Sequence, residues 1–491
     1  MTVSVPFVEV PAGHFIGGEL LPLRGDLLGV LRPSDRQEYA ALPLGDADLV
    51  DRAVRNAHAA FRTSGWATGH PRQRARIMRR WADLIEADAE TLGLIEAIGS
   101  TRPVSQAIRG DVPYVAETIR FYAEIADKFG GEVAATQSSR LGMIIAEPYG
   151  VTAAIVPWNV PLMMAGWKLG PTLAAGNAVV IKPSEMTPFS AVRLAQLAIR
   201  AGMPAGILNV IQGNGPITGD ALVRHPLIGK VSFTGSTAAG VAIMTASAQS
   251  GVKPVTLELG GKSPQVVFAD ADLDLAARCI VNSITFNAGQ VCVAGSRLIV
   301  ARPVADELLG KIVVAMEKVR PAPTWQADGT YSPVISAQQM ARVDGIVQRT
   351  VAQGASILTG GKPFEGCDGA FYQPTILHGV TDDMEGVREE IFGPVLAAQG
   401  FDDEEEGIAL ANHPTYGLAA GIYGRDISRV LRVTRRIEAG TIWVNRYGRS
   451  EDMAIPTGGY KQSGIGKDLG RHAFEANLRH KSVLIDIAES T

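Results

Sequence analysis

The residues with the clearest chemical potential are a cysteine and a glutamate, each set among glycines. Cys292 ends the run NAGQVC (residues 287–292), and Glu258 lies upstream in LELGGK (residues 257–262). A thiolate can attack a carbonyl carbon, and a carboxylate can activate water to release the acyl group. The pair therefore predicts covalent catalysis through a thioester. Taken alone, Cys292 could also be a small buried apolar residue. Glu258 could equally be a hydrogen-bonded carboxylate at a strand end.

A glycine-rich turn, GSTAAG (residues 235–240), follows a strand pattern at 230–234 and opens a helix. The free N–H groups of a helix N-terminus can bind phosphate. The spacing is not the Gly-x-Gly-x-x-Gly of ordinary dinucleotide folds, so a plain structural turn is the alternative. Lys182 and Glu185 follow another strand end, where they could bond ribose hydroxyls or form a surface ion pair. Asn159, in PWNVP (residues 157–161), is by itself compatible with a simple turn.

Alternating strands and helices must position these residues. Apolar runs predict buried strands at 149–157, 177–184, 208–211 and 230–234, with a helix over 189–201. Amphipathic patterns predict helices over 46–61 and 72–92. After Glu258 the pattern restarts with a strand at 265–268 and a helix at 273–284, and it continues to about Trp443. This alternation predicts parallel α/β architecture.

Composition narrows the class of protein. A chain of 491 residues, 46% apolar, predicts two or three domains with large cores. The net charge of −4 gives no reason to expect nucleic acid as a partner. An odd count of three cysteines fits a reducing compartment, and we expect a cytoplasmic protein with neither secretory signal nor membrane span. The acidic run 402–406 is expected to begin a solvated helix.

Seven motifs in order identify the chain as similar to the aldehyde dehydrogenase superfamily over essentially its full length. They are PWNVP (157–161), IKPSE (181–185), FTGST (233–237), LELGGK (257–262), GQVC (289–292), EEIFGPV (389–395) and GGYKQSG (458–464). Each motif is weak alone, but a chance match of all seven in this order is very improbable.

The resemblance implies a role for each motif. Cys292 would be the nucleophile, Glu258 the general base, and the Asn159 amide, with the Cys292 backbone N–H, the oxyanion hole. The residues implied in cofactor binding are Trp158, Lys182, Ser184, Glu185, Gly235, Ser236, Gly260, Glu390 and Phe392, and Lys182 is also expected among the catalytic residues. Glu258 favours hydrolysis over acyl transfer to coenzyme A. Glu185 would repel a 2′-phosphate, which favours NAD over NADP. The chemistry needs no metal.

The resemblance also implies the architecture. We expect a Rossmann-like cofactor domain (1–126 and 149–258), an α/β catalytic domain (259–475) and a small β oligomerisation element (127–148 and 476–491). Strand patterns at 140–147 and 481–487 fit that element. A terminal strand with no place in its own sheet often pairs with another subunit, so a homodimer or homotetramer is expected.

The expected substrate tunnel departs from common family patterns. Val160 and Thr457 stand where aromatic residues are common, and the other expected lining residues are Met164, Trp167, Val291 and Val293. Arg446 or Arg449 could meet a distal carboxylate of the substrate, unless their loop is simply surface or a subunit contact.

Three functions remain in competition. The leading hypothesis is NAD-dependent oxidation of an aldehyde to a carboxylic acid. A semialdehyde or another ω-substituted aldehyde, such as a γ-glutamyl-aminobutyraldehyde-like compound, is the alternative substrate. A cysteine-dependent thioesterase is the alternative from a different class, and it would need no cofactor residues.

Overall fold

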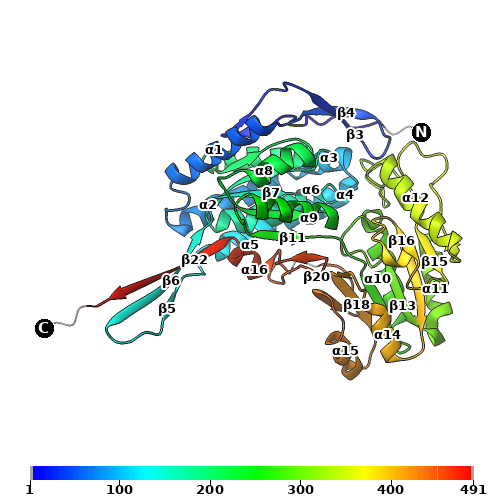
Figure 1. The fold of residues 1–491 in the computed structure, drawn as a ribbon. Helices are drawn as coiled ribbons and strands as arrows, with labels where there is room; N and C mark the ends of the chain where they lie inside the picture. Colours follow the sequence, from blue (N-terminus) through cyan, green and yellow to red (C-terminus); the bar gives the residue numbers. More distant parts are fainter. Residues whose placement is uncertain (1–3, 450–451, 488–491) are drawn as a thin grey trace.

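Two large sheets and a small projecting sheet organise the chain (Figure 1). The computed structural model describes residues 4–449 and 452–487. Strands alternate with helices in both large sheets, which confirms the predicted α/β class. Within the described residues, no helix is long and apolar enough to cross a membrane.

The first large sheet has the order β2-β1-β9-β8-β7-β10-β11-β21. Its parallel centre consists of β9 (Leu208–Val210), β8 (Ala178–Lys182), β7 (Val151–Ile155), β10 (Ile228–Thr234) and β11 (Val255–Glu258). The short strands β1 (Phe15–Ile16) and β2 (Glu19–Leu20) extend one edge. The helices packed with the sheet include α1 (Ala47–Thr63), α6 (Pro161–Ala174), α7 (Phe189–Arg200) and α9 (Thr237–Gln249). Because neighbouring elements bury the central strands, those strands read as continuous apolar runs.

The second large sheet has the order β14-β15-β16-β13-β12-β18-β19. Its strands are β14 (Ser356–Thr359), β15 (Thr375–His378), β16 (Val395–Phe401), β13 (Arg297–Ala301), β12 (Pro264–Val267), β18 (Ala419–Tyr423) and β19 (Thr441–Val444). Among its helices are α10 (Leu273–Thr285), α11 (Arg302–Met316), α12 (Ala337–Ala352), α14 (Glu404–Ala411) and α15 (Ile427–Thr434). The acidic run does begin a helix, because the Asp403 carboxylate accepts the Glu406 N–H as the N-cap of α14.

We call the part of the chain built around the first large sheet the first body, and the part built around the second large sheet the second body. The small sheet forms an arm that projects from the first body and ends near the C-terminus (Figure 1). It consists of β5 (Glu132–Ala134), β6 (Arg140–Pro148) and β22 (Leu478–Asp486), in the order β22-β6-β5. The strands predicted at 140–147 and 481–487 both lie in this sheet. β22 pairs antiparallel with β6 along its whole length, from Leu478 opposite Pro148 to Asp486 opposite Arg140.

The helix predicted over 72–92 is two helices, α2 (Pro71–Ala87) and α3 (Ala89–Gly99). Asp88 separates them with φ −98° and ψ 14°, outside the helical region. Its carboxylate accepts two hydrogen bonds from the Arg193 guanidinium, at 2.5 and 2.8 Å. This long-range pair holds the backbone at the bend, and no local pattern could predict it.

The expected boundary of the catalytic domain also differs from the structure. β21 (Gly464–Ile465) pairs antiparallel with β11, with Ile465 opposite Leu257. The following helix, α16 (Gly470–Glu475), packs against α6, and its Phe474 joins the core of the first body. Residues 464–475 therefore return to the first sheet, where they cover the edge strand that carries Glu258.

Candidate active site

The candidate site residues of the first body meet because of the parallel sheet. Thr234 and Glu258 end β10 and β11, and Asn159 follows the end of β7. Carboxyl ends of parallel strands lie at the same edge, where ligands bind in such folds. The second body faces this edge with Cys292, which lies between α10 and β13.

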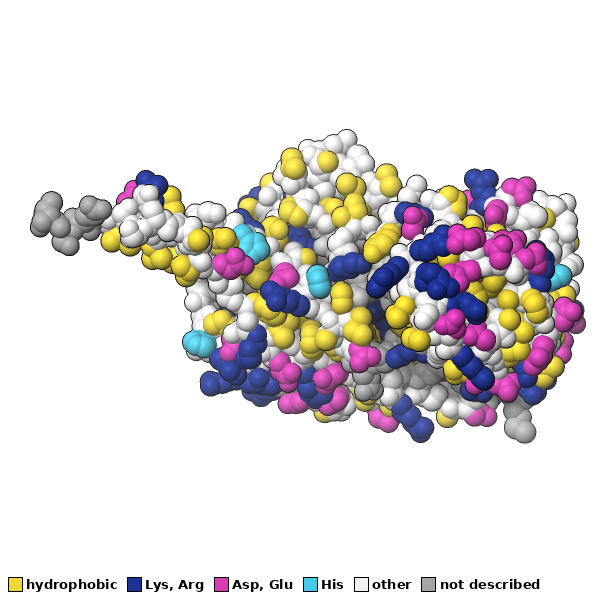
Figure 2. Space-filling model, turned by 90° about the horizontal axis from the view of Figure 1, so that it is seen from below, with side chains coloured by type: hydrophobic (Ala, Val, Ile, Leu, Met, Phe, Trp, Pro, Cys, Tyr) yellow, Lys and Arg dark blue, Asp and Glu magenta, His cyan; other side chains and the backbone are white. Residues whose placement is uncertain are grey.

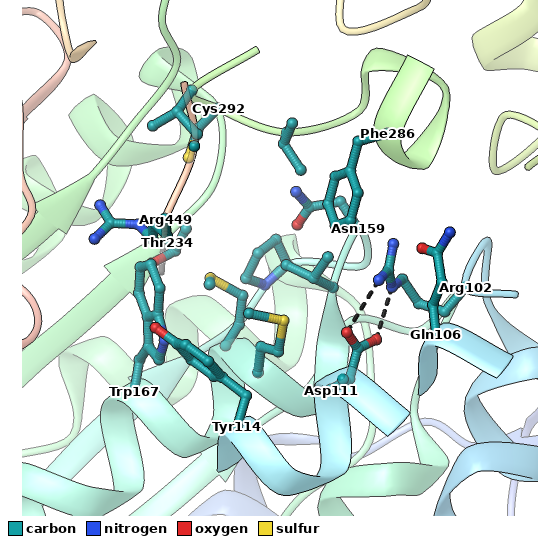
Figure 3. Close-up of a pocket in the computed structure, with 18 of the residues that line it drawn as sticks. Arg102, Gln106, Asp111, Tyr114, Asn159, Trp167, Thr234, Phe286, Cys292 and Arg449 are labelled. Atoms are coloured by element: carbon teal, nitrogen blue, oxygen red, sulfur yellow. Dashed lines mark hydrogen bonds and ion pairs between the residues drawn. The ribbon is translucent and has the colours of Figure 1, made fainter. Parts of the chain in front are cut away.

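A cavity of about 1640 Å³ joins these segments. Its wall includes the predicted residues Trp158, Asn159, Val160, Met164, Trp167, Gly235, Ser236, Gly260, Val291, Cys292, Val293, Glu390 and Phe392. The structure thus places the expected nucleophile, the oxyanion donor and part of the expected cofactor site on one continuous surface. Figure 3 shows Cys292 and Asn159 at this surface.

The segment before Cys292 has an unusual backbone. Asn287, Ala288 and Gly289 all have positive φ, at 52°, 51° and 70°. Such angles are costly for residues with a side chain, and they persist only where the surroundings impose them. A Cβ on Gly289 would lie 2.2 Å from the Gly393 carbonyl oxygen, so this position requires glycine.

Gln290 and Asn287 hold that backbone in place. The fully buried Gln290 accepts the Ile335 N–H at 2.8 Å and donates to the Asn287 and Pro333 carbonyls, at 2.8 and 3.2 Å. The Asn287 amide donates to the Asn159 carbonyl at 2.7 Å. The Gln290 bonds hold the loop within the second body, the Asn287 bond ties it to the first, and together they fix the path of the chain into Cys292.

Asn159 is tied to the same loop. Its Nδ2 donates one hydrogen bond to the Gln290 carbonyl at 2.8 Å. A side-chain amide nitrogen carries two hydrogens, so one N–H remains for another acceptor. The bond to Gln290 therefore orients Asn159 relative to Cys292 and leaves one donor for an oxyanion.

Both titratable groups of the predicted chemistry have raised pKa values. Burial, with a smaller contribution from the Glu258 charge, raises the pKa of the Cys292 thiol to about 12, although the Arg449 charge opposes the increase. Burial, with a contribution from Asp468, raises the pKa of Glu258 to about 8, while Lys168 and Arg449 oppose it. At neutral pH both groups are therefore mainly protonated.

Glu258 lies behind the cavity wall rather than in it. The residue is 4% exposed, and its Oε1 has no hydrogen-bond partner among the described residues. It lies next to Gly458, where an added Cβ would come within 2.7 Å of Oε1. Deeper in the core, Lys168 Nζ and Asp468 Oδ2 form a buried ion pair at 2.6 Å. A protonated carboxyl is the form that this burial favours.

The other part of the wall has features that suit a dinucleotide. Ser236 is the N-cap of α9, and its Oγ accepts the Ala239 N–H at 3.2 Å. Thr234 Oγ1, in the same wall, is buried with no hydrogen-bond partner in the described part of the chain. A helix N-terminus beside an unpaired hydroxyl fits a phosphate-containing ligand.

Aromatic and acidic residues flank that region. Trp158 and Phe392 pack edge to face with ring centroids 5.2 Å apart. Glu390 Oε1 accepts the Gly261 N–H at 2.9 Å, and burial raises the pKa of Glu390 to about 7. A Cβ at Gly260 would lie 2.3 Å from Glu390 Oε2, so the observed position of the Glu390 carboxyl group depends on the absence of a side chain there.

Lys182, Ser184 and Glu185 lie apart from the nucleophile. Lys182 Nζ donates to the carbonyls of Pro183 and Gly213, both at 2.8 Å, and lies 3.5 Å from Glu185 Oε2. None of the three belongs to the described wall of the cavity. The structure therefore shows no contact between Lys182 and the Cys292 thiol, although Lys182 was expected among the catalytic residues.

The expected tunnel residues lie in the wall with one exception. Thr457 is buried and lies outside the described wall, because its backbone exchanges two hydrogen bonds with Asp468, at 2.7 and 2.9 Å. Of the two candidate arginines, Arg449 lines the cavity, whereas Arg446 is exposed and is not among the described lining residues.

Several lining residues were missed in the sequence. They are Arg102, Gln106, Asp111 and Tyr114 from the segment around the π-helical turn Ala107–Asp111, together with Phe286 and Met453. The buried Arg102 donates to both Asp111 oxygens, at 2.7 and 3.0 Å (Figure 3). Their spacing matches no motif, and only Pro103 and Pro113 mark the segment as irregular.

Comparisons with known proteins agree with this site. The aldehyde dehydrogenase family model matches residues 24–483. The chain is 41% identical to the NADP/NAD-dependent aldehyde dehydrogenase PuuC of Escherichia coli (strain K12), covering 96% of this chain and 95% of that protein.

Two solved structures also resemble this chain closely. An indole-3-acetaldehyde dehydrogenase in complex with NAD⁺ has a TM-score of 0.95 and 41% identity, covering 98% of this chain and 97% of that one. A γ-glutamyl-γ-aminobutyraldehyde dehydrogenase from Burkholderia cenocepacia J2315 has a TM-score of 0.95 and 40% identity, covering 98% of each chain. The protein belongs to the aldehyde dehydrogenase family, which confirms the resemblance found in its motifs.

The strained loop gives a testable prediction. Gly289→Ala adds a methyl group that would collide with Gly393, and it puts a residue with a side chain in the left-handed backbone region. Both effects should displace Cys292, so the rate of aldehyde oxidation should fall by about 100-fold or more. Gly310→Ala is the control, because Gly310 is exposed in α11 with open space around its Cα. Activity of both variants is measured as NADH formation. Equal activity of the two variants would show that the loop does not position the thiol.

Proposed function

We propose that the protein oxidises an aldehyde to a carboxylic acid with NAD, through a thioester on Cys292. The observation that supports the proposal is the hydrogen bond from Asn159 to the backbone of the Cys292 loop, together with the position of both side chains in the wall of one cavity. An NAD⁺ complex of a relative with 41% identity supports the choice of cofactor.

In the proposed mechanism, Cys292 Sγ forms a bond to the aldehyde carbon as the thiol proton passes to water. The carbonyl oxygen becomes an oxyanion, which accepts hydrogen bonds from Asn159 Nδ2 and the Cys292 backbone N–H. One such preorganised donor contributes roughly 3–4 kcal/mol to lowering the barrier. NAD, when bound, supplies the oxidation by accepting a hydride from the same carbon, and a thioester on Cys292 remains.

Glu258 then completes the reaction. Its carboxylate takes a proton from water as the water oxygen bonds to the acyl carbon. The C–S bond breaks, the acid leaves, and Cys292 is restored. Because Glu258 lies behind the wall, its side chain must turn toward the thioester in this step. No residue of this step requires a metal.

Residues of both bodies would hold the cofactor. The α9 N-terminus with Gly235 and Ser236 suits the pyrophosphate, and Lys182 with Glu185 suits the adenosine ribose. On the other side, Glu390 would hold the nicotinamide ribose. A thioesterase would need none of these groups, so the convergence of Ser236 and Glu390 on the cavity of Cys292 favours oxidation.

The substrate is the least constrained part of the proposal. Relatives of about 40% identity bear names that include indole-3-acetaldehyde and γ-glutamyl-γ-aminobutyraldehyde. Both names denote aldehydes with a bulky or polar distal group. A semialdehyde or another ω-substituted aldehyde is therefore the second candidate for this cavity.

We also propose a cytoplasmic homo-oligomer, a dimer or a tetramer, in which the arm contacts a partner subunit. Apolar side chains lie along the projecting arm (Figure 2), and among them Val133 and Leu484 are 75% and 65% exposed. Exposed apolar patches of this kind mark protein interfaces. The three free cysteines suit a reducing compartment.

The two catalytic roles can be separated kinetically. Cys292→Ala should abolish NADH formation, whereas Cys279→Ala, in α10 outside the described wall, should retain activity. Glu258→Gln should give a burst of one NADH per site and then turn over about 100-fold or more slowly, because only hydrolysis is impaired. Stopped-flow absorbance at 340 nm records both phases. Activity that survives in Cys292→Ala would refute the mechanism.

The raised pKa of Glu258 determines a pH dependence. The carboxyl group must ionise to act as a base, so hydrolysis should accelerate as pH rises through about 8. An increase of about tenfold between pH 7 and pH 9 is expected when hydrolysis limits turnover. The increase should be absent from the slow phase of Glu258→Gln. A wild-type rate that is flat over this range would contradict the role of Glu258.

Cofactor preference tests the place of Glu185. The wild type should have a lower Michaelis constant for NAD than for NADP, because this carboxylate would repel a 2′-phosphate. Glu185→Gln should reduce the preference by about tenfold. Glu365→Gln, at a fully surface-exposed ion pair, is the matched control. Steady-state kinetics with both cofactors measures this preference. A wild type that prefers NADP would refute the role given to Glu185.

A further inference from the structure

Arg449 has a fixed position in the cavity wall. Its guanidinium lies over the Trp167 ring, with Cζ 4.9 Å from the ring centroid. Stacking on an indole holds the plane of a guanidinium and restrains its long side chain. Figure 3 shows Arg449 and Trp167 on the side of the cavity where Cys292 lies.

Part of the hydrogen-bonding capacity of Arg449 is not used. Arg449 Nη2 is buried and has no hydrogen-bond partner within residues 4–449 and 452–487. A guanidinium nitrogen can only donate, so this atom needs an acceptor. A buried charged donor without an acceptor is costly, and an anion is the acceptor that compensates it best.

A second arginine of the wall, the buried Arg102, provides a contrast. Arg102 donates to both oxygens of Asp111 and lies 4.5 Å from the Phe286 ring centroid. Its Nη1 is also without a partner among the described residues, but its charge is compensated by the Asp111 carboxylate. Arg449 has the same kind of aromatic support but lacks the corresponding carboxylate contact at Nη2.

Apolar side chains complete this part of the wall. Met164 and Met453 are 5% and 4% exposed, and Val293 adjoins the nucleophile. They would accommodate a short methylene chain whose aldehyde end reaches Cys292. The charge of Arg449 lowers the pKa values of Cys292 and Glu258, so the guanidinium lies within electrostatic reach of the reacting atoms.

We propose that Arg449, held on Trp167, binds a carboxylate at the far end of the substrate, so that the protein prefers short ω-oxo acids. The inference rests on the proposed aldehyde oxidation and adds the substrate class. It also resolves the choice between the two arginines of the loop, because Arg446 is exposed and its Nη2 donates to the Gly448 carbonyl at 3.4 Å.

The test compares substrates that differ only in the distal charge. Terminal oxo acids of four to six carbons, their methyl esters and the corresponding ω-amino aldehydes are assayed with the wild type, Arg449→Met, Arg449→Lys and Arg446→Met. The wild type should prefer an oxo acid over its ester by about 10- to 100-fold in kcat/KM. Arg449→Met should abolish this ratio mainly through KM, Arg449→Lys should restore part of it, and Arg446→Met should leave it unchanged.

Two outcomes would overturn the inference. One is a wild-type ratio near unity, and the other is a ratio that Arg449→Met leaves intact. If the wild type oxidises the esters as well as the oxo acids, only this inference fails. If the wild type oxidises no aldehyde, the proposed function fails as well.

A measurement without turnover decides the binding question separately. Calorimetric titration with the dicarboxylate product should show binding to the wild type and to Arg446→Met. Affinity should fall by about tenfold or more in Arg449→Met. Equal affinity in the two variants would refute the carboxylate contact, whatever the activity of the protein.

Discussion

The hydrogen bonds that Asn287, Gln290 and Asn159 form between the two bodies are the constraint on which the site depends. They hold residues 287–289 in the left-handed region, where only a surrounding framework can keep residues with side chains. The same bonds orient the Asn159 amide. Cys292 and Asn159, the proposed nucleophile and oxyanion donor, are therefore positioned by one framework, and a change in either body would alter both.

Burial determines the resting charge of the site. A thiol and a carboxyl removed from water both favour their neutral forms; the Glu258 charge also opposes ionisation of Cys292, and the Asp468 charge opposes ionisation of Glu258. The site thus has little reactive thiolate or base before a substrate enters. Arg449 acts in the opposite direction on both groups, so the residue proposed to bind the substrate also affects the catalytic protonation states.

The return of residues 464–475 to the first sheet links the two bodies behind Glu258. β21 covers the edge of β11, and Asp468 approaches Lys168 in the core. This segment follows the second sheet in sequence but packs with the first. Covalent continuity with one body and packing with the other thus help to bury Glu258, the proposed general base.

The sequence determined the local features. The apolar runs located the central strands to within a few residues, and the motifs around Cys292, Glu258 and Asn159 identified the family, because their chemistry depends on residue type and spacing. Distant packing decided the rest. The break at Asp88 depends on a long-range contact with Arg193, and the position of Thr457 depends on its backbone hydrogen bonds with Asp468. The sheet of the arm depends on the pairing of β22 with β6, which is distant in the sequence. The cavity wall includes Arg102 and Tyr114, and it includes Arg449 but not Arg446. These positions follow from how the two bodies close around one cavity, which no local sequence pattern encodes.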